Sequence, residues 1–226
     1  AEGRFATSDE QEILSRYVGW GGVADVFDPS KENWADEYAE LKSLLTEQEY
    51  EAARASTLNA HYTSPTVIRA IYEAIGNMGF TTGNILEPSC GVGNFFGMLP
   101  EGMMDSKLYG VELDPITGRI AKQLYPHADI QIKGFEETQR PHSFFDIAVG
   151  NVPFGNYSIP DKRYDKQHPL IHDYFFMKTL DKVRPGGVIA FITSSFTMDK
   201  ENPAVRRYIA QRAELLGAVR LPNNTF

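Results

Sequence analysis

The feature that most constrains this chain is the alternation of short apolar segments with amphipathic ones from residue 61 to residue 226. Buried strands are predicted at 84–89, 107–114, 128–135, 144–151, 187–195 and 216–222. Helices are predicted at 65–79, 115–126, 172–187 and 203–215. Strands that alternate with helices form βαβ units with right-handed crossovers. The sequence therefore predicts an α/β fold with a mainly parallel sheet of about six strands.

The first 60 residues differ from the rest in charge. They carry 13 acidic and 5 basic side chains, so the whole net charge of −8 belongs to them and the remainder is neutral. Apolar residues recur at helical spacing within 34–45, and Ser8 and Thr46 are predicted N-caps. We expect a helical extension at 1–60 and a catalytic domain at 61–226. The overall acidity disfavours nucleic-acid binding, but a neutral remainder could still present a basic face.

The composition also indicates in which cellular compartment the protein is expected. Cys90 is the single cysteine, so no intrachain disulfide can form, as is typical of a reducing compartment. No apolar run reaches the roughly 20 residues of a membrane helix, and the first residues do not form a signal-peptide pattern. The histidines lack metal-ligand spacing, so we predict no metal site. We expect a soluble, cytoplasmic protein.

Two glycines and an acid follow the first two predicted strands. Gly91 and Gly93 come directly after the first strand, where glycine lets the backbone approach a ligand. The loop lacks the G-x-G-x-x-G pattern, because Phe96 replaces the third glycine, and it is no P-loop. Glu112 ends the second strand, where a carboxylate can accept both ribose hydroxyls. Together they predict an adenosine-containing cofactor, either a dinucleotide or S-adenosylmethionine; a tight turn and a solvated acid are the alternatives.

The stretch Asn151–Val152–Pro153–Phe154 ends the fourth predicted strand and carries a resemblance. "LEPSCGVGNF", "GVELDP" and "FDIAVGNVPFG" resemble motifs I, II and IV of the amino-group DNA methyltransferases, and "HYTSP" resembles motif X of their gamma class. "RYVGWGG", "LNAHYTSP" and "LPNNTF" are similar to the methylase region of large methylase–helicase proteins of mobile genetic elements. This resemblance spans nearly the whole chain. It implies a Rossmann-like, S-adenosylmethionine-dependent methyltransferase fold that methylates adenine N6 in DNA.

The chemistry explains why such a loop is needed. The exocyclic amine of adenine is a poor nucleophile, because its lone pair is delocalised into the ring. By the resemblance, the side-chain oxygen of Asn151 and the backbone carbonyl of Val152 would accept its hydrogens. Phe154 would stack on the flipped base. The family usually has Pro where this chain has Val152. A valine still offers the backbone carbonyl, but its backbone φ angle is not fixed by a ring as that of proline is.

The resemblance also assigns a cofactor site. Tyr62 and Thr63 would hold the methionine end, Glu87 would meet its ammonium group, Glu112 would hold the ribose and Leu113 would pack on the adenine. The backbone of the glycine loop would wrap the cofactor at Cys90, Gly91, Gly93 and Asn94. The Cys90 side chain is expected to be a small packing residue.

The adenine pocket departs from the family pattern. The resemblance assigns Phe135 and Phe175 to it, with core packing as the alternative for each aromatic. The family often has Asp where this chain has Gly134, so either Glu136 replaces that carboxylate or the hydrogen bond is absent.

Other readings stay open. The same loop serves planar nitrogens in general, so the substrate could be a protein glutamine or an RNA base, or the domain could be a degenerate DNA- or partner-binding module. Lys162, Arg163 and Lys166 could contact phosphates or belong to a solvated loop. We expect the catalytic domain to be truncated at its C-terminus and to belong to a longer polypeptide with helicase-like regions. The acidic N-terminal helices are expected to support the cofactor lid around "HYTSP".

Overall fold

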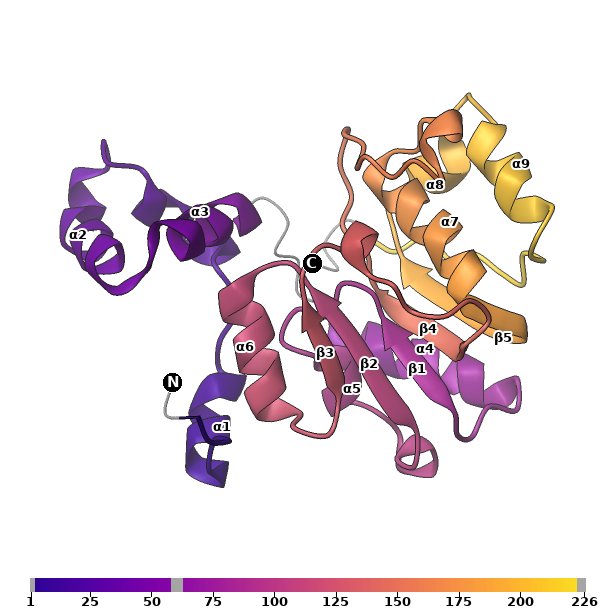
Figure 1. The fold of residues 1–226 in the computed structure, drawn as a ribbon, viewed down its shortest axis with the longest axis horizontal. Helices are drawn as coiled ribbons and strands as arrows, with labels where there is room; N and C mark the ends of the chain where they lie inside the picture. Colours follow the sequence, from indigo (N-terminus) through magenta and orange to yellow (C-terminus); the bar gives the residue numbers. More distant parts are fainter. Residues whose placement is uncertain (1–2, 58–62, 223–226) are drawn as a thin grey trace.

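The computed structural model describes residues 3–57 and 63–222. Its centre is a five-stranded parallel sheet in the order β3-β2-β1-β4-β5 (Figure 1). The strands are β1 (Asn84–Glu87), β2 (Lys107–Glu112), β3 (Asp129–Ile132), β4 (Phe145–Asn151) and β5 (Val183–Ile192). The predicted α/β class and parallel sheet are confirmed.

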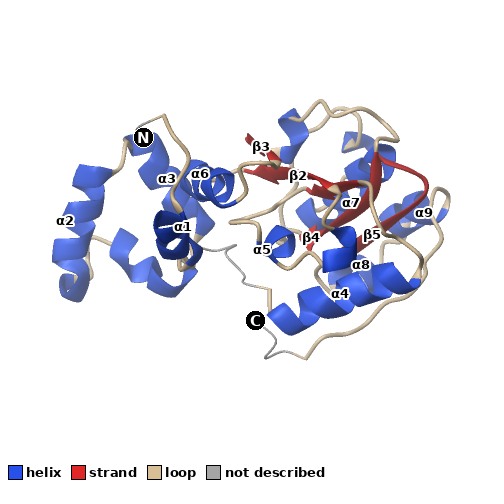
Figure 2. Ribbon diagram, turned by 90° about the horizontal axis from the view of Figure 1, so that it is seen from below, coloured by secondary structure: helices blue, strands red, loops and turns tan. Residues whose placement is uncertain are grey.

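Helices cover both faces of the sheet, as Figure 2 shows for α4 and α7. Those of the α/β region are α4 (Pro65–Asn77), α5 (Asn94–Gly97), α6 (Pro115–Leu124), α7 (Ile171–Lys182), α8 (Phe196–Asp199) and α9 (Ala204–Ala210). Short 3₁₀ turns lie at η3 (Glu101–Met103), η4 (Phe135–Glu137) and η5 (Asp165–Gln167). Side chains of α4 and α5 contribute to one apolar cluster against the sheet, and side chains of α7 and α9 contribute to a second one.

Alternation along the strands creates these two clusters. Leu86 and Ala148 belong to the cluster under α7, whereas their neighbours Ile85 and Ile147 belong to the cluster under α4. Successive side chains of a strand point to opposite faces, so a strand buried on both faces must be apolar throughout. This explains why the strands appear in the sequence as continuous apolar runs.

The N-terminal extension is helical, as predicted, and has a small core of its own. It contains α1 (Ser8–Ser15), η1 (Gly21–Phe27), η2 (Glu32–Trp34), α2 (Ala35–Leu44) and α3 (Glu47–Ser56). Phe27 and Tyr50 are buried in this core, against which Ile116 of α6 packs. The Gln11 side chain donates a hydrogen bond to the Gln123 carbonyl at 2.7 Å. The extension therefore docks on α6, at the β3 side of the sheet (Figure 1).

One of the two predicted helix N-caps is confirmed and the other is wrong. Thr46 caps α3 with a full capping box, as expected. Ser8 is not the cap of α1: Thr7 is, and its hydroxyl accepts a hydrogen bond from the Glu10 N–H. Glu10 completes the box from N3 by accepting the Thr7 N–H at 2.7 Å, whereas Gln11, three residues after Ser8, bonds to the Gln123 carbonyl instead.

Two predicted elements differ from the observed ones. The helix predicted to reach 187 ends at Lys182, and the segment 185–187 belongs to β5. The β4–β5 register shifts there, and Gly186 has φ +78°, so the Pro-Gly-Gly sequence forms a bulge at an edge strand, where proline is tolerated. The helix predicted to reach 215 ends at Ala210.

The sixth predicted strand is wrong within the described residues. Residues 216–222 form no strand, and Leu216 and Val219 are exposed. A strand is held by backbone pairing with a neighbour, and this segment pairs with none of the five strands, although Leu221 packs beside the α4 cluster. Among the described helices, none combines the length and apolarity that crossing a bilayer requires.

Candidate active site

Three predicted site residues end neighbouring strands. Glu87 ends β1, Glu112 ends β2 and Asn151 ends β4, and β1 lies between the other two strands. A Cβ on Gly150, just before Asn151, would lie 3.5 Å from Cγ of Glu87. The strand order reverses direction between β1 and β4, which is where ligands bind in open parallel sheets. The fold therefore gathers two carboxylates and an amide at its switch point.

The glycine loop is shaped by two left-handed residues. Gly91 has φ +55° and Gly93 has φ +87°. A Cβ on Gly91 would meet no atom within 4 Å, whereas a Cβ on Gly93 would lie 2.5 Å from the Tyr125 ring. Glycine at 93 thus admits Tyr125, and glycine at 91 leaves the backbone open to a ligand.

The Cys90 side chain packs as expected. It is buried with Phe96, Ala121 and Ile130 in a cluster between α6 and the sheet. Its N–H donates to the Val111 carbonyl at 2.9 Å. Burial raises the pKa of the Cys90 thiol well above its usual value, so the thiol is neutral and unsuited to act as a nucleophile.

Glu112 fastens the glycine loop to the end of β2. Its Oε2 accepts a hydrogen bond from the Gly91 N–H, and its Oε1 accepts one from the Asp114 N–H, each at 2.8 Å. Burial raises the pKa of Glu112 to about 7, although these N–H groups act in the opposite direction. A carboxylate has about four acceptor positions, so further hydroxyl donors can still bind. The sequence predicted a ribose acceptor but not this anchoring bond.

Glu87 is a buried acid whose Oε2 finds no hydrogen-bond partner among the described residues. The residue is 2% exposed. Burial, and then the charge of Glu112, raise the pKa of Glu87 well above its usual value. A buried carboxyl needs a partner or a proton, so this position suits a cationic group of a ligand.

A cavity of about 520 Å³ lies beside the glycine loop. Thr63 and Asn94, both predicted cofactor residues, line it together with Tyr17 and Val18 of the N-terminal extension. Tyr62 lies outside the described residues. Sequence reasoning missed Tyr17 and Val18, because their place depends on how the extension docks. A larger surface groove, of about 750 Å³ between α4 and 97–103, includes none of the predicted site residues.

The apolar residues that were predicted to contact the cofactor differ in their exposure to solvent. Leu113 is 71% exposed beside Glu112, as a residue that packs on a ligand would be. Phe135 and Phe175 are buried, with ring centroids 5.1 Å apart and planes inclined by 31°. Both belong to the core cluster under α7, which favours core packing for most of each ring. Phe135 is 3% and Phe175 4% exposed, so the core encloses almost the whole of each side chain.

The Glu136 carboxylate lies where a side chain at position 134 would begin. A Cβ on Gly134 would overlap Oε1 of Glu136. Gly134 therefore makes room for this carboxylate, which approaches the place of the family's aspartate from two residues further along the chain.

The loop after β4 is fixed despite its valine. Val152 is buried, and its N–H donates to the Ile192 carbonyl at 3.1 Å. Asn151 pairs with Ile192 in the β4–β5 register, and Pro153 and Phe154 are partly buried. Burial and pairing to β5 thus replace the restraint that proline would give.

Comparison with protein families assigns most of this chain. Residues 44–226 match the model of the family described as N-6 DNA Methylase. The matched range includes the glycine loop, both acids and the Asn-Val-Pro-Phe loop, and it begins in the N-terminal extension.

Individual relatives agree with this match. The Defense against restriction protein B of Escherichia phage P1 is 29% identical over 231 residues, which cover 100% of this chain and 9% of the phage protein. The Type II methyltransferase M.XamI of Xanthomonas campestris pv. amaranthicola is 25% identical over 178 residues, covering 69% of this chain and 34% of that protein. The chain thus spans a minor part of these relatives.

A solved structure shows the same fold. A Listeria monocytogenes protein assigned to the class I S-adenosylmethionine-dependent methyltransferases superimposes with a TM-score of 0.63 at 15% identity. The superposition covers 96% of this chain and 80% of the Listeria chain. The sheet and its helices therefore form the Rossmann-like fold of these methyltransferases.

Proposed function

Because the chain belongs to the N-6 DNA methylase family, we propose that it transfers a methyl group from S-adenosylmethionine to the exocyclic N6 amine of adenine in DNA. The observation that carries the proposal is the meeting of Glu87, Glu112 and Asn151 at three adjacent strand ends. The two acids, which would bind the cofactor, thus lie next to the amide that would bind the acceptor amine.

The residues of the site fit the cofactor. Glu87 is buried without a hydrogen-bond partner among the described residues for its Oε2, and it would take the cofactor's ammonium group. Glu112 would accept from the ribose hydroxyls while it holds the Gly91 N–H. The open space beside Gly91 would allow close approach of the backbone to the ligand. When bound, the cofactor supplies a methyl group on a sulfonium, which is already an activated electrophile.

Four further residues would complete the cofactor site. Thr63 and Asn94 would line the methionine end, because they share one cavity. Leu113 would cover one face of the adenine. The Glu136 carboxylate would accept from the adenine amine, since it reaches the space beside Gly134.

Asn151 and Val152 would prepare the acceptor amine. Two acceptors on the hydrogens of adenine N6 favour a pyramidal nitrogen with an available lone pair. The Asn151 side-chain oxygen would be one acceptor and the Val152 carbonyl the other. The bond from the Val152 N–H to the Ile192 carbonyl supports this role, because it fixes the Asn151–Val152 peptide, which lies between the two proposed acceptors. Pre-set dipoles of this kind need no reorganisation during reaction.

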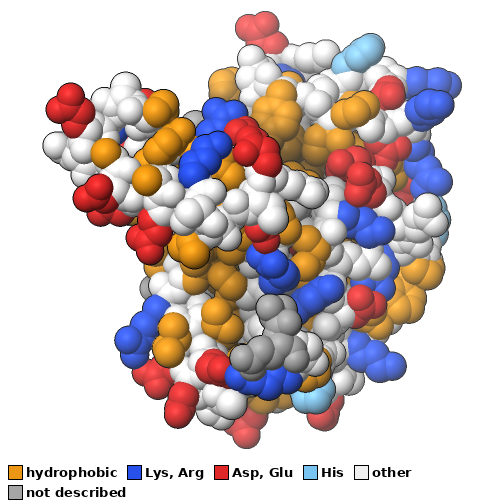
Figure 3. Space-filling view, turned by 60° about the vertical axis from the view of Figure 1, so that its left-hand side comes forward, with side chains coloured by type: hydrophobic (Ala, Val, Ile, Leu, Met, Phe, Trp, Pro, Cys, Tyr) orange, Lys and Arg blue, Asp and Glu red, His pale blue; other side chains and the backbone are white. Residues whose placement is uncertain are grey.

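DNA would approach from the side of the segment 155–170. The N6 amine is inaccessible inside a duplex, so the base would be flipped and stacked on Phe154. Lys162, Arg163 and Lys166 are exposed in this segment and would contact phosphates. The N-terminal extension is less suited to DNA, because acidic side chains are spread over its surface (Figure 3).

We also propose a biological setting. Residues 1–60 would be an accessory extension and residues 61–226 the catalytic domain of a longer polypeptide, which the match to 9% of the phage P1 protein supports. That protein is named for defence against restriction, and methylation by this chain would protect DNA in the same sense.

Labelled methyl transfer tests the proposed function. The chain is incubated with methyl-labelled S-adenosylmethionine and unmethylated DNA, and the digested DNA is separated into nucleosides. We expect the label in N6-methyladenine, and we expect none when RNA or a glutamine-containing peptide replaces DNA. Label in the RNA or peptide instead, or in no substrate, would overturn the proposal.

A further inference from the structure

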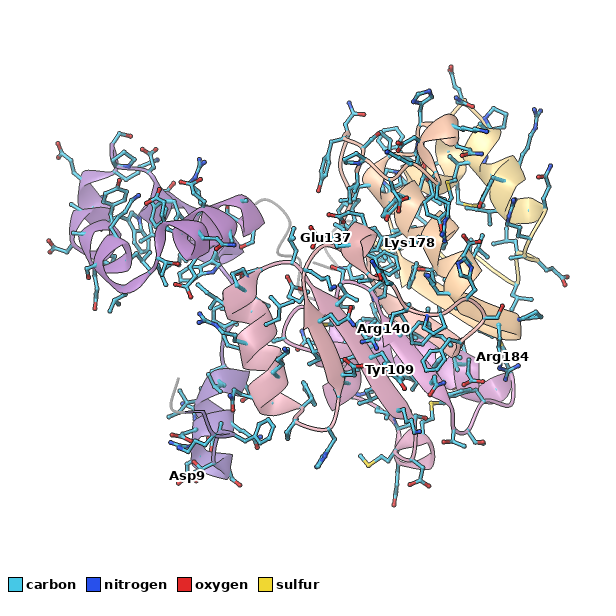
Figure 4. The ribbon with its side chains drawn as sticks, viewed as in Figure 1. Asp9, Tyr109, Glu137, Arg140, Lys178 and Arg184 are labelled. Carbon is cyan, nitrogen blue, oxygen red and sulfur yellow. The ribbon has the colours of Figure 1, made fainter. Side chains whose placement is uncertain are left out.

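Lys178 lies buried where two segments beside the site meet. It belongs to α7, is 4% exposed, and donates a hydrogen bond to the Glu136 carbonyl at 2.9 Å. Its Nζ also lies 3.5 Å from Oδ2 of Asp161. Figure 4 shows Lys178 on α7 with Glu137 of η4 across from it. One ammonium group thus joins η4 to the segment that follows the Asn-Val-Pro-Phe loop.

Asp161 is held in place at its end of this link. The Tyr174 hydroxyl donates to its Oδ2 at 2.9 Å, and the Arg163 N–H donates to its Oδ1 at 3.1 Å. Burial acts to raise the pKa of Asp161, but the Arg163 N–H, the Tyr174 hydroxyl and the Lys178 charge outweigh it and lower this pKa. Asp161 is therefore ionised, and it organises the turn that continues to Asp165.

The other end of the link touches the proposed adenine side of the site. Lys178 Nζ lies 5.1 Å from the centroid of the Phe135 ring, a cation–π distance. Phe135 stacks on Phe175, and Glu136 follows Phe135 in η4. A ligand that fixes Phe135 and Glu136 would therefore also fix the acceptor of Lys178.

A gain in folding stability does not explain why a lysine is buried at position 178. Burial lowers the pKa of Lys178, because a buried ammonium loses its hydration. Buried ion pairs are often no more stabilising than apolar residues of similar size. A methionine could fill the same space between Phe135 and Tyr174, but it could not bond to Glu136 and Asp161 together.

We propose that Lys178 is a positioning residue that couples the adenine side of the cofactor pocket to the segment 155–170 beside the target base. This inference rests on the proposed function, because it needs the cofactor to bind near Phe135 and Glu136. Cofactor binding then stabilises the observed conformation of 155–170 further, and the binding of DNA there strengthens cofactor binding by the same factor.

Limited proteolysis with trypsin reads this coupling directly. Lys162, Arg163 and Lys166 are exposed in the segment, and their cleavage products are distinguished by mass. The cleavage rate is measured for the wild type and for Lys178→Met, with and without saturating S-adenosylmethionine, and calorimetry measures cofactor affinity in parallel. Lys182→Met is the matched control, since Lys182 is also 4% exposed but donates to the Arg140 carbonyl instead.

The cofactor should slow cleavage by about fivefold or more in the wild type and in Lys182→Met, and by less than about twofold in Lys178→Met. If Lys178→Met does not fold, Asp161→Asn serves in its place, because it removes the charge at the other end of the link. Cofactor binding without protection in the wild type, or with equal protection in Lys178→Met, overturns the inference alone. Absence of cofactor binding by the wild type overturns the proposed function and the inference with it.

Discussion

The Gly91 N–H donates a hydrogen bond of 2.8 Å to Oε2 of Glu112, so the glycine loop after β1 is tied to the end of β2. The two residues lie 21 positions apart in the chain, and the parallel pairing of β1 with β2 brings them together. One carboxylate therefore shapes the loop and faces the proposed ribose site.

Glu112→Gln should weaken cofactor binding. The amide nitrogen cannot accept a hydrogen bond, and the variant loses the charge that favours ribose hydroxyl donors. We expect the affinity for S-adenosylmethionine to fall by about tenfold or more, which corresponds to at least about 1.4 kcal/mol. Calorimetric titration measures it. Glu101→Gln, an exposed acid of η3, is the control, and equal affinity in both variants would contradict the role of Glu112.

Cofactor binding should strengthen as pH rises from 6 to about 7.5, near the Glu112 pKa of about 7. The pKa of Glu87 is raised as well, so both acids bind protons that a cationic ligand displaces. Titrations in buffers of different ionisation enthalpy should show proton release on binding. A flat pH profile, or one that Glu112→Gln leaves as steep, would contradict this expectation.

The same acids should lower the stability of the ligand-free protein as pH rises. Glu112 has a folded-state pKa of about 7 against an ordinary 4.5, so the folded state holds more protons between these values. The free energy of unfolding should therefore fall across this window, by at most about 1.4 kcal/mol per pH unit for one group. Denaturant titrations at several pH values measure the slope, and Glu112→Gln should reduce it.

Asn151→Ala should separate chemistry from binding. The amide acts on the acceptor amine, so methyl transfer should fall by about 100-fold or more while cofactor affinity changes by less than about twofold. Single-turnover transfer and calorimetry measure the two effects. Asn156→Ala, an exposed asparagine further along the same loop, is the control. A variant that lost both properties together would place Asn151 in the cofactor site instead.

The N-terminal extension should contribute to cofactor binding. Val18 is 65% exposed and lines the 520 Å³ cavity with Thr63 and Asn94. Val18→Trp should fill part of this space and weaken binding of S-adenosylmethionine by about tenfold. Ile13→Trp is the matched control, because Ile13 is 67% exposed on α1 and does not line the cavity. Deletion of residues 1–56 should weaken binding further, and unchanged affinity in Val18→Trp would place the cofactor elsewhere.

Local patterns in the sequence predicted the elements that carry the site. The apolar runs before Asn151 and Glu112 predicted β4 and β2, because a strand buried on both faces needs continuous apolar residues, although the second strand was predicted to reach 114 and ends at Glu112. The predicted end of α7 at 187 was wrong, since Pro185, Gly186 and Gly187 form a bulge in β5 only through the pairing of β5 with β4.

Contacts between segments distant in the sequence could not be predicted from such local patterns. The place of Tyr17 and Val18 in the cavity depends on the docking of the extension to α6, which the spacing of apolar residues does not encode. The link from Lys178 to Glu136 and Asp161 joins three separate segments, and a lysine in an amphipathic helix is ordinarily solvent-exposed.

Calorimetric titration of the chain with S-adenosylmethionine, with NAD as the control ligand, tests the proposed cofactor site most directly. We expect binding of S-adenosylmethionine in the micromolar range and no binding of NAD, because the glycine loop lacks the dinucleotide pattern while Glu87 suits an ammonium group. Binding of NAD, or of neither ligand, would contradict the proposal that these strand ends form a methyl-donor site.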